Sequence, residues 1–225
     1  NSSSLDANKS GKRGFQSAMK LKLPRQIGIE AVFDLSALLL IFFYLASYFT
    51  PEHLFSQTTT TGGDTASHYY TAQYLKDYLL PHGKILGWMQ GNLAGFPVFQ
   101  FYFPLPFVLM VFISYLTGLQ IAFKIVTVLG VFLLPVCTYF GFRLLRFPFP
   151  TPALTALFTL PFLFMEANSM WGGNILSMLA GEFTYSLGLA LMVLFAGSCY
   201  RGVQENRWSL PNGFLLSLVG FSHGY

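Results

Sequence analysis

Charged residues are almost absent from two long stretches of this chain, and this absence constrains its fold more than any motif. Between residues 85 and 142 only Lys124 is charged, and between 147 and 200 only Glu166 and Glu182 are charged. Over the whole sequence 10% of residues are charged, whereas soluble domains carry about 25%. A soluble protein of this size could not keep so apolar a surface in water. The sequence therefore predicts a membrane protein that crosses the bilayer several times.

Composition also excludes other classes of protein. Cys137 and Cys199 both lie in apolar runs and are too few for a disulfide-stabilised scaffold. The net charge of +4 comes largely from the N-terminal tail, so no basic face favours binding to nucleic acid. Residues 1–26 are predicted to form a cytoplasmic tail that contacts anionic lipid headgroups. Its basic side chains are Lys9, Lys12, Arg13, Lys20, Lys22 and Arg25.

The apolar runs predict an all-α integral membrane protein, with a long loop at about 50–120 and a shorter loop at about 166–182 on the outer side. The expected spans lie at about residues 27–49, 121–142, 149–165, 183–200 and 210–225. The last run falls short of the roughly 20 residues that a spanning helix needs. We therefore expect this sequence to be the N-terminal portion of a longer protein.

The distribution of arginines predicts the orientation. The basic tail places the N-terminus in the cytoplasm, at the plasma (inner) membrane. If residues 101–116 crossed the bilayer, four arginines would fall outside, and if these residues lie in the outer interface, all four fall inside. These arginines are Arg143, Arg146, Arg201 and Arg207. We therefore expect interfacial helices at 101–116 and at 67–80, both within the long first outer loop.

The most informative polar residues follow two glycines in this first outer loop. Asp64 and His68 are four residues apart in the expected helix, so they share one helix face. Together they are suited to hold a metal ion or a sugar hydroxyl. The alternative is that Asp64 caps the helix N-terminus and that His68 is an interfacial polar residue.

A second polar and aromatic stretch follows at 88–106. Trp88 and Asn92 lie in a glycine-rich loop, and Tyr102 lies in an aromatic segment that ends in Pro-Leu-Pro. Side chains of these types can stack on a carbohydrate and donate hydrogen bonds to it. The alternative is a belt of aromatic residues at the level of the lipid headgroups.

These motifs occur in a fixed order: an acidic residue soon after the first span, a helix, and a glycine-rich loop that ends in aromatic-Pro-Leu-Pro. They are Gly63-Asp64-Thr65 with His68, Trp88 with Asn92 and Gly95, and Phe101-Tyr102-Phe103-Pro104-Leu105-Pro106. The order resembles the GT-C class of polytopic membrane glycosyltransferases. It looks most like an uncharacterised branch that is labelled 6-pyruvoyl-tetrahydropterin synthase-related membrane proteins, and that label does not imply pterin chemistry here.

The resemblance implies a GT-C-like N-terminal transmembrane module with its active site on the outer face. It implies that Asp64 is catalytic, because the acidic residue of the first outer loop has this role in the class. A second acidic residue is common in the second outer loop, where this chain offers Glu166 and Glu182. Glu182 is the better candidate because neighbouring glycines leave room for a ligand, whereas a solvated position at the membrane rim is the alternative for both.

Further candidates lie in and beside the second outer loop and in the spans. Trp171 and Asn174 are candidate substrate-binding residues in that loop. Lys124 begins a span on the outer side and is placed to reach a lipid phosphate, with snorkelling to the interface as the alternative. His223 lies in the last apolar run, where an intramembrane histidine is a functional candidate by default.

The expected function is transfer of a sugar from a polyprenyl-phosphate-linked donor to a glycan, lipid or protein acceptor. Asp64 is expected to act as the general base, or to bind a divalent cation (Mg²⁺ or Mn²⁺) together with His68. Two other functions stay open: a transporter or lipid flippase, and a GT-C scaffold without catalytic activity. The transporter is less favoured because most polar residues lie in the outer loops rather than at the bilayer midplane.

Overall fold

The computed structural model describes residues 28–91, 94–166, 172–207 and 210–224, and helices dominate them. Three helical stretches are long and apolar enough to cross a membrane. They are α1 (Ile29–Tyr48), α5 (Leu119–Leu144) and the stretch Ile175–Gln204, in which α8 (Ile175–Ser177) and η3 (Met178–Glu182) lead into α9 (Phe183–Gln204). The predicted helical membrane fold is thus confirmed, and the basic tail lies outside the described residues.

Helices α5 and α9 form the centre of the bundle because glycines bring their backbones into contact. A Cβ on Gly197 would lie 2.5 Å from the carbonyl oxygen of Gly141, and a Cβ on Gly130 would lie 2.5 Å from the backbone nitrogen of Leu187. Small residues at such crossings let transmembrane helices pack closely. Any side chain at Gly130 or Gly197 would push the two helices apart.

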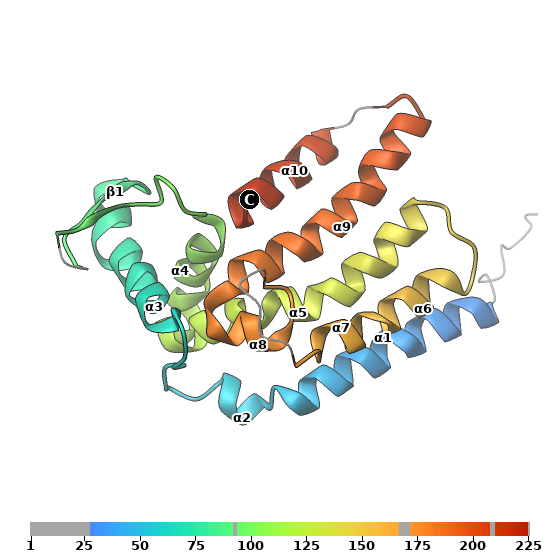
Figure 1. Ribbon diagram of the computed structural model, residues 1–225, viewed down its shortest axis with the longest axis horizontal. Coiled ribbons are helices and arrows are strands. Elements are labelled where there is room, and N and C mark those ends of the chain that lie inside the picture. The colour runs from blue at the N-terminus through green and yellow to red at the C-terminus, as the bar shows by residue number, and fades with distance from the viewer. Residues whose placement is uncertain (1–27, 92–93, 167–171, 208–209, 225) are drawn as a thin grey trace, which may run out of the picture.

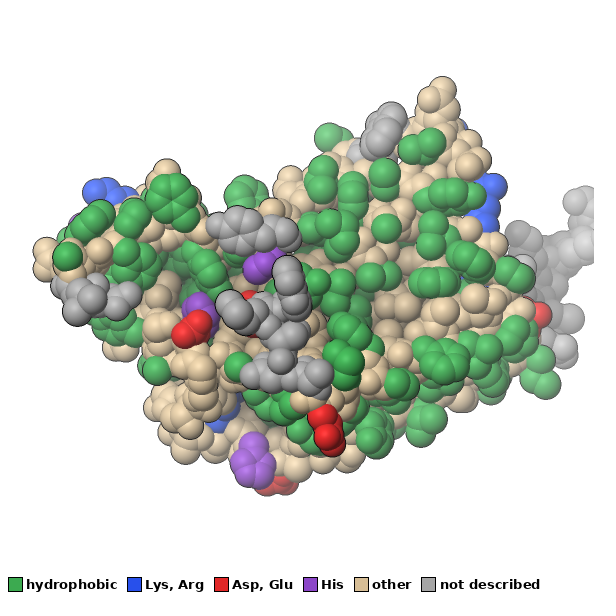
Figure 2. Space-filling view, viewed as in Figure 1, with side chains coloured by type: hydrophobic (Ala, Val, Ile, Leu, Met, Phe, Trp, Pro, Cys, Tyr) green, Lys and Arg blue, Asp and Glu red, His purple; other side chains and the backbone are tan. Residues whose placement is uncertain are grey.

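Helix α1 lies at the edge of the bundle (Figure 1) and turns many apolar side chains outward, as Figure 2 shows along its length. One polar contact links it to α5: the Tyr139 hydroxyl donates a hydrogen bond of 2.8 Å to the buried carboxylate of Asp34. Between α5 and α8 the chain forms α6 (Thr151–Leu157) and α7 (Thr159–Leu163). The span expected at 149–165 is therefore a shorter apolar helix, interrupted at Phe158.

The long first loop folds into a separate lobe at one end of the bundle (Figure 1). It begins with the short helix α2 (Pro51–Leu54) and continues through α3 (Thr65–Tyr74), η1 (Leu75–Leu79) and η2 (Leu80–His82). The lobe closes with α4 (Leu105–Thr117), which passes across this end of the bundle. The helices expected at 67–80 and 101–116 correspond to α3–η1 and α4.

Between these helices the lobe contains a β-hairpin that the sequence did not suggest. Strands β1 (Gly87–Met89) and β2 (Phe96–Val98) pair antiparallel, with Trp88 opposite Pro97. Their alternation places Met89 and Val98 in the interior and leaves Trp88 exposed. At the C-terminal end, α10 (Leu210–Ser222) packs beside α9.

Stability should depend on the glycine contact between α5 and α9. We expect Gly197→Ala to lower the free energy of unfolding by about 1–3 kcal/mol, because the added methyl group meets the Gly141 backbone. Thermal unfolding of the purified protein in detergent measures this effect. Gly220→Ala in α10 is the matched control, since nothing lies within 4 Å of its added Cβ, and it should be neutral or slightly stabilising. Equal melting temperatures for the two variants would contradict the packing argument.

Candidate functional site

The two segments predicted as outer loops meet backbone to backbone. The Asp64 N–H donates a hydrogen bond of 2.8 Å to the carbonyl oxygen of Ala180 in η3. A Cβ on Gly63 would lie only 2.0 Å from that same oxygen, and Gly63 has φ +46°. Glycine is therefore required at this position for both space and backbone conformation.

The η3 side of this contact also depends on glycine. Gly181 has φ +127°, and its Cβ would lie 3.1 Å from the Cβ of Asp64. Glu182 is the next residue along the chain, and a Cβ on Gly172 would lie 3.0 Å from the Cβ of Glu182. The contact therefore places Asp64 beside the turn that carries Glu182, although 117 residues separate them in sequence.

Asp64 occupies the N-cap position of α3 without capping it. The structure describes no hydrogen bond from its side chain to the first turn of the helix. The position of Asp64 therefore agrees with the capping alternative, but its carboxylate makes no capping hydrogen bond to the first turn that the structure describes. The negative charge still acts locally, because it raises the pKa of the neighbouring His68.

His68 is largely enclosed by aromatic rings. It stacks on Tyr102 with ring centroids 5.4 Å apart, and it contacts the rings of Phe107 and Phe183. Burial lowers the pKa of His68 below its ordinary value, and the charge of Asp64 offsets part of that decrease. The imidazole is therefore neutral at neutral pH, in the form that can accept a proton.

Tyr102 joins the first loop to α9. Its hydroxyl lies 3.5 Å from Nε2 of His68 and 3.5 Å from the hydroxyl of Thr184. Burial raises the pKa of Tyr102, and the charges of Glu182 and Asp64 raise it further, against a lowering by the Thr184 contact. Both carboxylates are thus close enough to act on the same phenol, which stays protonated.

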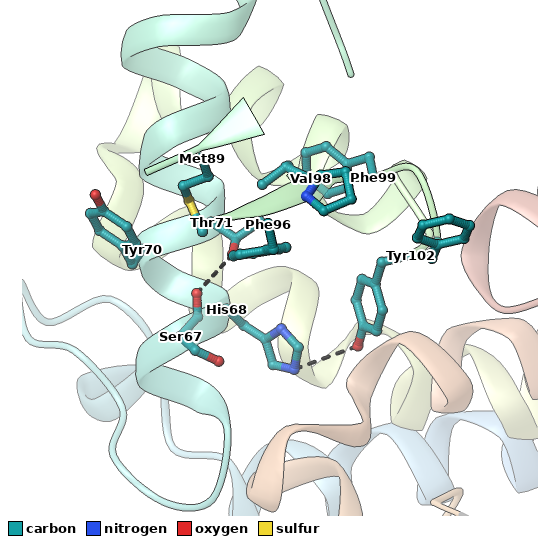
Figure 3. Close-up of a pocket in the computed structure, with 11 residues that line it drawn as sticks. Ser67, His68, Tyr70, Thr71, Met89, Phe96, Val98, Phe99 and Tyr102 are labelled. Atoms are coloured by element: carbon teal, nitrogen blue, oxygen red, sulfur yellow. Dashed lines mark hydrogen bonds between the residues drawn. The ribbon is translucent and has the colours of Figure 1, made fainter. Parts of the chain in front are cut away.

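A pocket of about 590 Å³ opens beside this group, between α3 and the hairpin. Figure 3 shows His68 and Tyr102 pointing toward each other at one end of the pocket, with hairpin side chains opposite α3. The lining residues are Ser67, His68, Tyr70, Thr71, Met89, Phe96, Pro97, Val98, Phe99, Phe101 and Tyr102. Figure 2 shows acidic and histidine side chains gathered where the lobe meets the bundle.

The sequence analysis missed Thr184 and the hairpin side chains. Thr184 is fully buried and lies between Tyr102 and His223, whose Nδ1 is 3.3 Å from the threonine hydroxyl. A hydroxyl residue inside an otherwise apolar run was the available signal. His223, which was predicted to lie in the membrane, also contacts the ring of Phe103 and therefore lies next to the Tyr102 segment.

Lys124, which was predicted to reach a lipid phosphate, has a different environment. Its ammonium group donates hydrogen bonds to the carbonyl oxygens of His53 and Ser56, at 2.6 and 2.7 Å, and to the Ser56 hydroxyl at 2.8 Å. The side chain is 5% exposed. Lys124 therefore holds α2 and the segment after it against α5, and the Ser56 hydroxyl is a second donor to the His53 carbonyl.

Two other predicted substrate-binding residues also lie apart from the pocket. Trp88 is exposed on the outer side of β1 and packs against Gly95. Asn174 is buried and caps α8, where its side chain accepts a hydrogen bond from the Ser177 N–H and donates one to the Met165 carbonyl. Asn92 and Trp171 lie outside the described residues.

The predicted divalent cation has fewer protein ligands than such a site ordinarily uses. Within residues 28–91, 94–166, 172–207 and 210–224, no three His, Cys, Asp or Glu side chains are grouped to hold a metal ion. Asp64 and His68 are neighbours on one helix, so a cation held by them would need further ligands from substrate or solvent. The cation therefore stays a prediction.

Comparison with known proteins gives one match. The model of a family described as "6-pyruvoyl-tetrahydropterin synthase related domain; membrane protein" matches residues 99–225, which is more than half of the chain. The matched region begins at the pocket-lining segment that contains Tyr102 and includes α4, α5, η3 and α9. No curated protein and no solved structure matches the chain.

The site around Asp64 should come apart if the contact between the Asp64 loop and η3 is blocked. We expect Gly63→Ala to separate Asp64 from η3, because its Cβ cannot share space with the Ala180 carbonyl. Hydrogen exchange at the Asp64 amide reports the separation: this amide, which is bonded to the Ala180 carbonyl, should be protected in the unaltered chain and should exchange faster after Gly63→Ala. Gly83→Ala, where the added Cβ meets nothing within 4 Å at a similarly positive φ, is the matched control. Equal protection of the Asp64 amide in the Gly63 and Gly83 variants would contradict this assignment.

Proposed function

The chain belongs to this family of 6-pyruvoyl-tetrahydropterin synthase related membrane proteins, and from that premise we propose that it is a glycosyltransferase. The proposed reaction transfers a sugar from a polyprenyl-phosphate-linked donor to an acceptor hydroxyl at the outer face of the membrane. One observation carries the proposal: Asp64 and the turn bearing Glu182 are pinned together beside His68, Tyr102 and a pocket. Clustered acidic and basic groups at a cavity are typical of active sites.

His68 is the group placed to take the acceptor proton. It lines the pocket, whereas Asp64 lies one helical turn away. An acceptor hydroxyl is a poor nucleophile at neutral pH, so its attack on the sugar carbon needs a base within reach. The new bond joins the acceptor oxygen to that carbon, the bond from the carbon to the phosphate oxygen breaks, and polyprenyl phosphate leaves. The proton passes to His68.

Asp64 supports this step through its charge. The sequence favoured Asp64 itself as the base, and the geometry instead supports a pair in which its carboxylate stabilises the protonated imidazole of His68. This is the role of the acidic partner in other His–Asp pairs. The imidazole of this pair lies among aromatic rings, whereas Asp64 is exposed.

Glu182 and Tyr102 complete the proposed site. Tyr102 keeps its proton because its pKa is raised, so its hydroxyl can donate a hydrogen bond to the substrate. Glu182 sits at the bend between η3 and α9, on the side of the site that faces the bundle. A bound Mg²⁺ or Mn²⁺ would supply positive charge to the leaving phosphate, and no step above depends on it.

The pH dependence of transfer distinguishes the roles of Asp64 and His68. Since burial lowers the pKa of His68, the neutral imidazole persists below pH 6.5 and the acid limb of the rate profile should lie below that value. Asp64→Asn removes the charge that raises this pKa, so the limb should move to still lower pH. His68→Gln should reduce transfer at least ~10²-fold and abolish the limb.

The measurement is release of polyprenyl phosphate from a polyprenyl-phosphate-linked sugar by the full-length protein in liposomes, with thermal stability recorded alongside. Asp77→Asn, an exposed acid of the same lobe, is the matched control and should behave as wild type. Chelation followed by addition of Mg²⁺ or Mn²⁺ tests the cation. Transfer by His68→Gln at the wild-type rate would refute the assignment, and movement of the lipid-linked sugar across the bilayer without release would favour the transporter.

A further inference from the structure

We infer that the pocket between α3 and the hairpin is the acceptor site, and that it selects a neutral amphipathic alcohol with one hydroxyl at His68 and an apolar body along the hairpin. This inference rests on the proposed function and adds the chemical class of the acceptor. It narrows the three expected acceptor classes, glycan, lipid and protein, to the lipid-like one.

The walls of the pocket are apolar along most of their length. Met89 and Val98 face inward from the two strands and are almost fully buried, and Phe96, Phe99 and Phe101 extend this surface. The tryptophan expected to stack on a sugar, Trp88, points to the opposite side of β1. The pocket thus presents an apolar surface to the body of its ligand.

The serine and threonine hydroxyl groups along the α3 wall already donate to the backbone, and the third hydroxyl residue of this wall, Tyr70, points away from His68 and Tyr102 (Figure 3). The Ser67 hydroxyl donates to the Asp64 carbonyl at 2.9 Å, and the Thr71 hydroxyl donates to the Ser67 carbonyl at 2.9 Å. A sugar ring has several hydroxyl groups, and each one left without a partner in an apolar pocket carries a desolvation cost. His68 and Tyr102 lie together at one end, and this suits a ligand with a single polar end.

Charge complementarity excludes an anionic ligand from this pocket. No lysine or arginine is found among the described residues that line it, and the carboxylates of Asp64 and Glu182 act on its polar end. Lys124 donates to backbone carbonyls and Lys76 lies over the ring of Tyr115, while the exposed Lys84 precedes β1 and does not line the pocket. A phosphorylated ligand would meet repulsion here, so the donor phosphate binds outside this pocket.

The size and position of the pocket agree with an acceptor that dissolves in lipid. A volume of about 590 Å³ lies within the range of small-molecule sites, roughly 300–1,000 Å³. Phe101 at its rim is 73% exposed, and the neighbouring α4 exposes Phe112 and Leu116. The exposed ring of Phe101 offers an apolar entrance to the pocket, and the exposed side chains of α4 belong to the next helix along the chain.

Photolabelling tests the inference on the full chain in lipid nanodiscs. The probes are a long-chain primary alcohol with a diazirine near its end, and the phosphate monoester of the same alcohol. Mass spectrometry should find the alcohol on residues 89–101 of the hairpin segment, with labelling by the phosphate monoester about tenfold weaker. Equal labelling by the two probes would overturn the inference.

A pair of substitutions tests the location. Met89→Trp adds bulk inside the pocket and should reduce hairpin labelling about tenfold, whereas Leu86→Trp adds the same ring at an exposed position before β1 and should leave it unchanged. If Met89→Trp fails to fold, competition in the unaltered chain replaces it. Unlabelled alcohols of increasing chain length should compete better with the probe until the chain is too long for the pocket. If the alcohols only partitioned into lipid, competition would keep increasing with chain length.

The outcomes separate this inference from the proposed function. Pocket labelling with a length cutoff, in a protein that releases no polyprenyl phosphate, would refute the transferase and leave the alcohol site standing. Transfer to a soluble oligosaccharide with no pocket labelling would support the transferase and overturn the assignment of the pocket to an alcohol acceptor. Labelling that resists Met89→Trp in a folded protein would overturn the inference.

Discussion

Backbone contact between α5 and α9 is the constraint on which the other parts of the structure depend. At Gly141 and Gly197 the backbones of the two helices touch directly, with no side chain between them. At Gly130, nearer the lobe, the backbone of α5 touches that of α9 in the same way. In lipid, where apolar side chains gain little by leaving one apolar medium for another, such close approach is a main source of helix association. The position of η3, at the start of α9, is fixed by this contact.

Because η3 is fixed, the first loop has a rigid partner. The Gly63 and Gly181 positions together make a junction with no side chain between Asp64 and the Ala180 carbonyl. Asp64 is exposed, and its fixed position still lets its charge raise the pKa of both His68 and Tyr102, as a smaller effect beside burial. Rigid placement is what gives the carboxylate its influence.

The membrane fold and part of the site were predictable from sequence, and the reasons differ. Charge-poor runs predict helices in lipid because a charge has a large cost there, and the four-residue spacing of Asp64 and His68 places them on one helix face. The contact of Asp64 with η3 joins segments that are far apart in the sequence, and a local pattern of residue types cannot predict such a contact. The hairpin was hidden because a three-residue strand leaves too short an alternation to recognise. The contacts of Lys124 were hidden because its acceptors are backbone carbonyls, which every sequence contains.

The long separation between Asp64 and Ala180 has a consequence for biosynthesis. Ribosomes add about 5–20 residues per second, so the loop with Asp64 emerges some ten seconds before its hydrogen-bond acceptor exists. Throughout that interval α3 and the hairpin are present while the far side of the junction is not. The cluster of acidic and basic groups therefore comes into being late, only when α9 has docked on α5, and a truncated product of translation would contain Asp64 and His68 without a working arrangement of either.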